Sequence, residues 1–318
     1  MNSGTGTSGI LLVDKPQGIT SHDVVARVRK AAGTRKVGHA GTLDPMATGL
    51  LVVGINSSTR LLTFLVGLDK SYEATIRLGV ATTTDDAEGE TLAVVDASGV
   101  EQSAIDSGIA ALRGDIEQVP TTVSAIKVDG KRAYALAREG VEVELKARPV
   151  TIARFDVLAR RDVEIEAPGD EAPGAGSPGA TVHAIDLDVV VDCSSGTYIR
   201  ALARDLGRAL GVGGHLTALR RTRIGPFPVA DAAVLEGVDV AARLLAPTRV
   251  AEQLFDVLPL SEQQSIDLSH GKRPGVEHAD SVGPVAAITP DGRLAGLVSI
   301  SNGRAKPIVN FPNDEVFA

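Results

Sequence analysis

A glycine-rich segment between apolar elements constrains the fold of this 318-residue chain more than any other feature. Residues 38–49 read Gly-His-Ala-Gly-Thr-Leu-Asp-Pro-Met-Ala-Thr-Gly. Glycine permits backbone conformations that other residues resist, and proline biases the preceding residue, Asp44, away from helix. The apolar runs at 9–13 and 50–55 predict buried strands. The sequence therefore predicts a loop at 38–49 that carries a carboxylate.

Asp44 is a candidate for chemistry, and spacing alone leaves a second interpretation open. A carboxylate on a loop between two apolar elements can be aimed into a cleft. Capping of the turn that follows is the commoner role of an aspartate at this spacing. The residue pattern by itself does not decide between the two roles.

Helix signals precede and follow this loop. A helix capped by Thr20 or Ser21 should end at Gly33 and bury three valines. Strand-like patterns occupy 71–80 and 185–192. In the second, apolar residues alternate with Asp186, Asp188, Val190 and Asp192, which is the period of a strand. A later helix should end at Gly211 with a buried stripe at every third or fourth position. The two buried sets are Val24, Val25 and Val28, and Ile199, Leu202, Leu206 and Leu210.

Arginines recur at every fourth position on the later helix. Arg200, Arg204 and Arg208 therefore line one face of it. We expect Arg204 and Arg208 to form a solvated charged face.

The tail of the chain carries its own structural signals. Ser261 and Gln264 predict a capping box that opens a short helix, which should stop at Gly271. Two strands should be joined at 290–292. This pattern predicts a small β-rich domain from about residue 257.

The distribution of charge reverses a first impression from the net charge. A net charge of −8 argues against a nucleic-acid partner, because phosphates attract cations. However, residues 1–60 hold seven basic and three acidic residues, and 196–225 hold six basic and one acidic, giving +4 and +5. The remainder carries −17. If the two basic segments meet in space, they form one basic face on an acidic molecule.

Cysteine content and the N-terminus bear on compartment and metal content. The single Cys193 excludes an internal disulfide and a zinc site built on several thiolates. The first eight residues are polar and uncharged, unlike a signal peptide, and no apolar run is long enough to span a bilayer. We therefore expect a cytoplasmic protein.

Five motifs follow one another within residues 9–228, and a closing Leu219-Arg220-Arg221-Thr222 fits the same series. They are Asp14-Lys15-Pro16-x-Gly18-x-Thr20-Ser21; the 38–49 segment; Lys70-Ser71-Tyr72 leading to Leu78-Gly79; Ser124-Ala125-x-Lys127-x-x-Gly130-x-Arg132-x-Tyr134; and Cys193-Ser194-Ser195-Gly196-Thr197-Tyr198-Ile199-Arg200. In order and spacing this series resembles the TruB family of tRNA pseudouridine synthases.

The resemblance implies an α+β fold. Its catalytic domain would have a mixed, largely antiparallel central sheet with flanking helices and a thumb-like insertion, and a small β-rich C-terminal domain would follow. The expected parts are a disordered N-terminus at 1–8, the catalytic domain at 9–230 with its thumb-like insertion at 120–151 and a mobile low-complexity loop at 167–180, a connector at 231–256, and a small PUA-like RNA-binding domain at 257–318.

The resemblance also implies the reaction. Uridine 55 in the T-loop of tRNA would be isomerised to pseudouridine without metal or cofactor. Asp44 matches the essential aspartate of the family, Arg200 matches the arginine that pairs with it, and Tyr72 matches the tyrosine that packs on the target base. Because the uridine lies inside a folded loop, the base must be flipped out, which costs a few kcal/mol.

Further matches concern RNA binding. His39 matches a residue that fills the space left by the flipped base, and Tyr198 and Leu219 match residues that border the base pocket. Lys15 and the arginines at 200–223 are expected to hold phosphates, with Lys15 as the foremost single contact. The expected partner is the T-arm of tRNA, with no membrane and no required protein partner, and the expected state is a monomer.

Alternatives remain open for both the route and the function. Asp44 can attack the ribose carbon, add to the uracil, or abstract a sugar proton to give a glycal. A non-catalytic RNA-folding protein could use the same basic residues, and a close relative could act on another RNA or use a guide RNA. The presence of Asp44 together with Arg200 favours the enzyme, because a pure RNA binder has no need for a carboxylate that faces phosphates.

Overall fold

The structure is a computed structural model that describes residues 7–121, 127–128, 131–132, 145–166 and 181–312. The chain forms two compact units, Met1–Val66 with Gly225–Ala318, and Gly67–Ile224. The predicted mobile loop at 167–180 lies outside the described residues, as do residues 1–6 of the predicted N-terminal segment and most of the predicted insertion at 120–151. The predicted domain boundaries at 230 and 256 stay predictions.

The first unit is built on a short sheet covered by a helix. Strand β1 (Gly9–Lys15) pairs antiparallel with β3 (Thr48–Ile55) and parallel with β14 (Ala233–Val234), and β2 (Val37–Ala40) pairs antiparallel with β3. Helix α1 (Ser21–Ala32) packs its valines into the core of this sheet. The other elements of this part are η1 (Asn56–Leu61), α2 (Leu62–Val66), β13 (Phe227–Pro228), η2 (Val229–Asp231), α6 (Val240–Arg243) and α7 (Pro247–Glu252).

Helix α1 begins and ends at the predicted residues. The Thr20 hydroxyl accepts a hydrogen bond from the Asp23 N–H, and the Asp23 carboxylate accepts from the Thr20 N–H. Gly33 adopts a left-handed φ of 63°, which glycine reaches without steric cost. Local capping signals therefore suffice to place this helix.

The C-terminal part has a sheet and an apolar core of its own. The strand order is β15-β16-β17-β18, and α8 (Glu262–Ser269) opens with the predicted capping box of Ser261 and Gln264. The strands are β15 (Val257–Pro259), β16 (Val285–Ile288), β17 (Leu294–Ser301) and β18 (Arg304–Asn310). Buried apolar side chains of these elements, Leu268 and Val298 among them, form one cluster. The predicted small β-rich C-terminal domain is confirmed.

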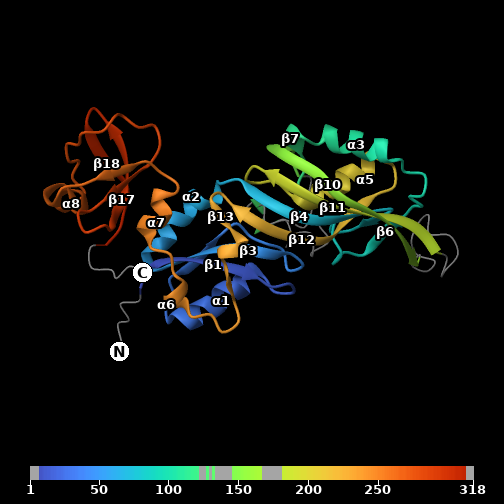
Figure 1. Cartoon of the computed structure of the whole chain (residues 1–318), viewed down its shortest axis with the longest axis horizontal. Helices are drawn as coiled ribbons and strands as arrows, with labels where there is room; N and C mark the ends of the chain where they lie inside the picture. Colours follow the sequence, from blue (N-terminus) through green and yellow to red (C-terminus); the bar gives the residue numbers. More distant parts are fainter. Residues whose placement is uncertain (1–6, 122–126, 129–130, 133–144, 167–180, 313–318) are drawn as a thin grey trace. The chain divides into compact units, whose positions relative to one another are not determined.

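The second unit is an antiparallel sheet with helices packed on it. Its strand order is β12-β4-β11-β10-β7. Helix α5 packs on β12 and β4, and α3 packs on α5 and β10 (Figure 1). These elements are β4 (Lys70–Leu78), α3 (Gln102–Ala111), β7 (Gly114–Gln118), β10 (Arg148–Glu166), β11 (Thr181–Cys193), α5 (Ile199–Ala209) and β12 (Gly214–Ile224). Two short hairpins complete it, β5 (Val80–Thr82) with β6 (Thr91–Val94), and β8 (Lys127–Val128) with β9 (Lys131–Arg132).

The predicted fold class is confirmed, with corrections in detail. The predicted mixed, largely antiparallel pairing is observed: β1 and β14 of the first unit run parallel, whereas the pairs β1–β3, β2–β3, β4–β12, β4–β11, β10–β11 and β7–β10 are antiparallel. The predicted loop at 38–49 is shorter than expected, because Val37–Ala40 and Thr48–Ile55 form strands. Leu210, predicted to be buried, is half-buried where α5 ends. Among the described residues, no helix is long and apolar enough to cross a membrane.

Candidate active site

The turn that carries Asp44 is held from one side by a serine of helix α1. The Ser21 hydroxyl donates to the Leu43 carbonyl at 3.1 Å and accepts from the Leu43 N–H at 2.9 Å. One buried side chain thus fixes both polar groups of the residue just before Asp44. Leu43 and Met46 are buried, whereas Asp44 itself is half-buried.

Lys15 holds the same turn from the other side. Its ammonium donates to the carbonyls of Pro16 (2.9 Å), Ile19 (2.7 Å) and Pro45 (3.3 Å), and the Pro45 carbonyl also accepts from the Gly18 N–H at 2.8 Å. Lys15 is fully buried. An ammonium has three protons, and these three carbonyls take them. The predicted phosphate contact of Lys15 is therefore not what its contacts indicate: the side chain fastens the Asp44 turn.

His39 lies on strand β2, close to the same turn in sequence. Its ring meets that of His22, on α1, edge to face, with 5.6 Å between the centroids. The side chain is half-buried. Packing against a helix residue gives the imidazole a defined position beside the strand.

Tyr72 lies on a buried face of the second unit's sheet. In the antiparallel register of β4 and β12, Tyr72 is opposite Arg221 and Ala74 is opposite Leu219. Side chains two residues apart share a face, so Tyr72, Leu219 and Arg221 project to the same side. All three are buried, and Arg221 is only 1% exposed. The register therefore brings the predicted base-contacting residues Tyr72 and Leu219 together, and adds an arginine to them.

Lys70 extends this buried face and has an altered pKa. It is opposite Cys193 in the β4–β11 register and donates to the Leu68 carbonyl. Burial, followed by the nearby Arg221 guanidinium, lowers the pKa of the Lys70 ammonium from 10.5 to about 8. Burial raises the pKa of the Cys193 thiol to about 11.

The buried Lys70 ammonium should make the free energy of unfolding depend on pH. Comparison of wild type with Lys70→Met tests this expectation. Because the pKa is lower in the folded chain, the unfolded chain binds more protons between pH 8 and 10.5, so stability rises with pH in that window. We expect the wild-type free energy of unfolding to gain about 1 to 2 kcal/mol relative to Lys70→Met from pH 7.5 to 10.5, allowing for solvent screening. Urea denaturation across this range measures the difference, with the exposed Lys306→Met as control. Parallel curves for wild type and Lys70→Met would contradict the expectation.

Arg200 lies in the first turn of α5 and forms a buried ion pair. Its guanidinium nitrogen Nη1 is 3.3 Å from Oδ2 of Asp86 and donates to the Thr84 carbonyl at 2.7 Å. Both side chains are 4% exposed. Asp86 also accepts from the Thr84 hydroxyl and the Glu88 N–H. The loop after β5 thus holds this arginine through a carboxylate that the sequence had not singled out.

Arg204, one turn further along α5, corrects a prediction. It was expected to be solvated, but it pairs with Asp205 at 2.9 Å and with Asp85 at 3.4 Å, and its side chain is 18% exposed. Burial raises the pKa of the Asp85 carboxyl, and the guanidinium of Arg204 opposes that rise. Arg208 is exposed, as expected.

The predicted residues thus fall into two groups. Lys15, His39 and Asp44 belong to the first unit, and Tyr72, Tyr198, Arg200 and Leu219 to the second. Tyr198 is the residue before α5 and is half-buried. Three buried residues with polar contacts were not predicted to have a role at the site: Ser21, Lys70 and Asp86. Arg221, expected with its neighbours to hold phosphates, is buried. Ser21 contacts Leu43, and Asp86 pairs with Arg200, which are distant in sequence, so the sequence offered no signal for these two contacts.

Comparison with known proteins accounts for this combination of motifs. Family models match nearly the whole chain: TruB family pseudouridylate synthase (N-terminal domain) at 29–199, tRNA pseudouridylate synthase B C-terminal domain at 200–262, and tRNA pseudouridine synthase II, C-terminal, at 255–312. The chain belongs to the TruB family of pseudouridylate synthases. It is therefore an isomerase, and the predicted family and enzyme class are confirmed.

Curated relatives of this TruB-family chain match nearly all of its length. It is 57% identical to the tRNA pseudouridine synthase B of Leifsonia xyli subsp. xyli. The alignment of 315 residues covers 97% of this chain and 98% of the relative. The enzyme of the same name from Arthrobacter sp. (strain FB24) is 53% identical over 316 residues, again covering 97% and 98%. That of Corynebacterium glutamicum (strain R) is 51% identical over 316 residues, covering 98% and 99%.

Solved structures support the fold of this TruB-family chain. A chain in the structure of an H/ACA RNP bound to a substrate RNA containing 2'-deoxyuridine matches with a TM-score of 0.66 at 22% identity, covering 99% of this chain and 93% of that one. A chain of a Cbf5-Nop10-Gar1 complex matches with a TM-score of 0.66 at 23% identity, covering 100% and 93%. At this identity the likeness concerns the fold alone.

Proposed function

We propose that this pseudouridine synthase isomerises uridine 55 in the T-loop of tRNA, with Asp44 as the catalytic carboxylate. The N1 glycosidic bond breaks, the uracil rotates, and C5 takes the place of N1 on the ribose carbon. C5 gives up its proton, and N1 gains one. An ionised carboxylate can stabilise or attack the electron-poor centre that this reaction creates.

The observation that carries the proposal is the way in which the Asp44 turn is fixed. Ser21 binds the main chain before Asp44, and Lys15 and Gly18 bind the carbonyl after it. The Ala47 N–H donates to the carbonyl of Asp44 itself. A carboxylate placed by so many fixed groups needs little reorganisation during the reaction, which is how preorganised sites lower a barrier. Turn capping alone would not require such bracing from two other segments.

The other predicted residues receive roles in the same proposal. Arg200 supports the ionised form of the catalytic carboxylate, and Tyr72 packs on the flipped uracil, with Leu219 and Tyr198 at the rim of its pocket. His39 occupies the position that the base leaves. The proposal needs no protein partner, because every residue that it uses belongs to this chain.

The position of the product tests the substrate assignment. Unmodified tRNA is incubated with the protein, and pseudouridine is mapped by carbodiimide labelling and primer extension. We expect a single stop that reports position 55, and no product in a tRNA that has cytidine there. Pseudouridine at another position, or product formed in the cytidine-55 tRNA, would contradict uridine 55 as the target.

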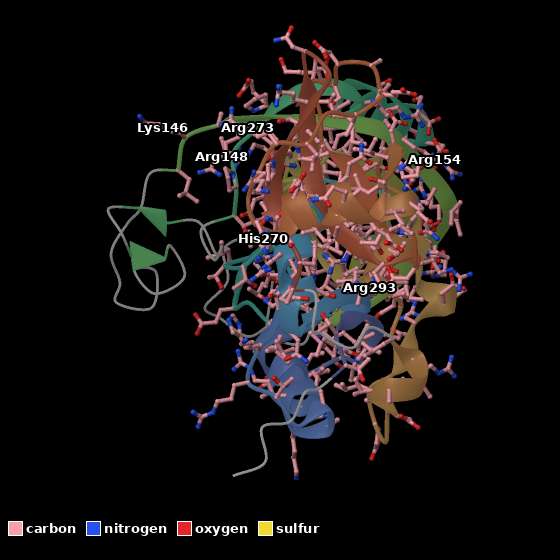
Figure 2. All side chains as sticks on the ribbon, turned by 90° about the vertical axis from the view of Figure 1, so that its left-hand side faces the viewer. Lys146, Arg148, Arg154, His270, Arg273 and Arg293 are labelled. Atoms are coloured by element: carbon pink, nitrogen blue, oxygen red, sulfur yellow. The ribbon has the colours of Figure 1, made fainter. Side chains whose placement is uncertain are left out.

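Exposed cations of the second unit suggest where RNA phosphates bind. Lys146 and Arg148 lie near the end of the predicted insertion at 120–151, at the start of β10, and both are exposed (Figure 2). Arg154, further along the same strand, is exposed too, but it pairs with Asp156 at 2.7 Å. We include Lys146 and Arg148 among the phosphate contacts.

The salt dependence of tRNA binding distinguishes these cations. The double variant Lys146→Gln/Arg148→Gln should weaken binding at low salt and reduce the slope of log Kd against log salt by about 1 to 2, since each phosphate contact contributes about one unit. Arg154→Gln is the matched control and should leave the slope nearly unchanged. Fluorescence titration at several salt concentrations measures both. Equal slopes for wild type and the double variant would remove these residues from the RNA interface.

A further inference from the structure

A buried amide joins strand β7 to the start of helix α5. Gln118 is the last residue of β7 and is 2% exposed, whereas the other residues of that strand are exposed or half-buried. Its Oε1 accepts from the Tyr198 N–H at 2.8 Å, and its Nε2 donates to the Tyr198 carbonyl at 3.1 Å. Burying an amide is costly unless it is hydrogen-bonded, and here both ends of it bind the main chain of one residue.

That residue controls how α5 begins. Tyr198 is at the N-cap position, where its side chain makes no capping hydrogen bond. Its carbonyl accepts the first helical bonds, from Ala201 at 3.1 Å and Leu202 at 3.3 Å. Gln118 therefore fixes the peptide groups on both sides of the Tyr198 Cα and, through them, the direction of the tyrosine side chain and the first turn that carries Arg200.

Other contacts join the same parts of the unit but do not reach the main chain of Tyr198. Arg204 donates to the Val119 carbonyl at 2.8 Å. The Thr151 N–H donates to the Ser194 hydroxyl at 2.9 Å, and the Ser194 N–H donates to the Thr151 carbonyl at 2.9 Å. These bonds already hold the end of β7 and the start of β10 to the segment that leads into α5. These segments are therefore attached to one another without Gln118. The two hydrogen bonds of Gln118 add a fixed orientation of the Tyr198 main chain.

We propose that Gln118 is a positioning residue for pseudouridine formation, acting through Tyr198 and Arg200. This inference rests on the roles that the proposed function gives to those two residues. Loss of the amide should leave tRNA binding and the fold largely intact and should slow the chemical step. Misplacement of reacting groups by about 1 Å can cost about a hundredfold in rate.

A first test of the proposal compares one variant of Gln118 with a control variant of a neighbouring residue. Gln118→Met keeps the length of the side chain but removes both hydrogen bonds, and Ser194→Ala removes a neighbouring bond that does not touch Tyr198. Single-turnover rate, tRNA Kd and thermal unfolding are measured for each with the full chain. We expect Gln118→Met to be about tenfold to a hundredfold slower than wild type. Its Kd should stay within about threefold of wild type, and Ser194→Ala should keep a nearly normal rate.

Gln118→Glu gives a readout that a merely structural role would not move. A protonated carboxyl can donate to the Tyr198 carbonyl and accept from its N–H, as the amide does, whereas an ionised carboxylate faces that carbonyl with like charge. Because burial raises the pKa of a carboxyl, the rate of this variant relative to wild type should recover as pH falls from 8 to 6. This measurement also decides the matter if Gln118→Met does not fold.

Several results would overturn the proposal. One is a Gln118→Met rate within about twofold of wild type. Another is a rate loss equal to that of Ser194→Ala at equal loss of stability, and a third is a Gln118→Glu rate ratio that does not change with pH. Absence of product with wild type would instead overturn the proposed function itself, and this inference with it.

Discussion

Arg200→Met is expected to slow pseudouridine formation by about a hundredfold to a thousandfold and to lower the free energy of unfolding by about 3 kcal/mol. The rate should fall because the proposed function gives Arg200 the role of supporting the catalytic carboxylate, and loss of one preorganised charged group costs about this much. The stability falls because Asp86, whose side chain is 4% exposed, loses its buried ionic partner. Single-turnover kinetics and urea denaturation measure the two effects separately.

A double variant separates the catalytic role of Arg200 from its structural one. In Arg200→Met/Asp86→Asn no charge of the pair stays buried, and the asparagine oxygen can still accept from Thr84 and Glu88. We expect most of the lost stability to return, since buried ion pairs are often replaceable by neutral groups, while the rate stays low. Recovery of the rate along with the stability would show that Arg200 only holds the fold.

Local signals explain which parts of the fold could be predicted. The caps of α1 at Thr20 and Gly33, and the capping box of Ser261 and Gln264, involve residues a few positions apart, so the sequence alone specifies them. The strand at 185–192 followed from its alternation and appears within β11. These elements need no information about distant partners.

Strands whose residues are charged were not recognised. In β12, Arg220, Arg221 and Arg223 were interpreted as a basic segment with phosphate contacts and not as a strand, yet pairing with β4 makes them part of a sheet and buries Arg221. Most of β10 was likewise not predicted as a strand, because its exposed positions are rich in arginine and acidic residues. In such strands the neighbouring strands decide the structure, and propensity is a weak guide.

In the candidate site, too, local sequence signals predicted some features, whereas others depend on the tertiary structure. The glycines and Pro45 placed Asp44 on a loop, and the family resemblance supplied the roles of Tyr72 and Arg200. Neither could show that the ammonium of Lys15 is used on three carbonyls, because those acceptors are main-chain groups whose positions depend on the fold. A basic residue in an RNA-binding protein is readily interpreted as a phosphate contact. Burial distinguishes the two roles, and burial is a property of the tertiary structure.

The central claim is that Asp44 performs the isomerisation, and Asp44→Asn tests it with little change in shape. The amide keeps the size of the carboxylate and its ability to accept hydrogen bonds, but it cannot act as an anion, nucleophile or base. The contacts of Ser21 and Lys15 to the turn involve main-chain groups, so the substitution should leave the turn in place. Thermal unfolding of the variant should therefore match that of wild type.

The most direct measurement uses unmodified tRNA tritiated at uracil C5 and follows tritium release and tRNA binding in the same samples. We expect wild type to release the tritium of one uridine per tRNA without added metal. Asp44→Asn should release it at least about a thousandfold more slowly while its Kd stays within about threefold. Equal release by the two proteins would contradict the assignment of Asp44 as the catalyst, and binding without release by wild type would indicate an RNA-folding protein.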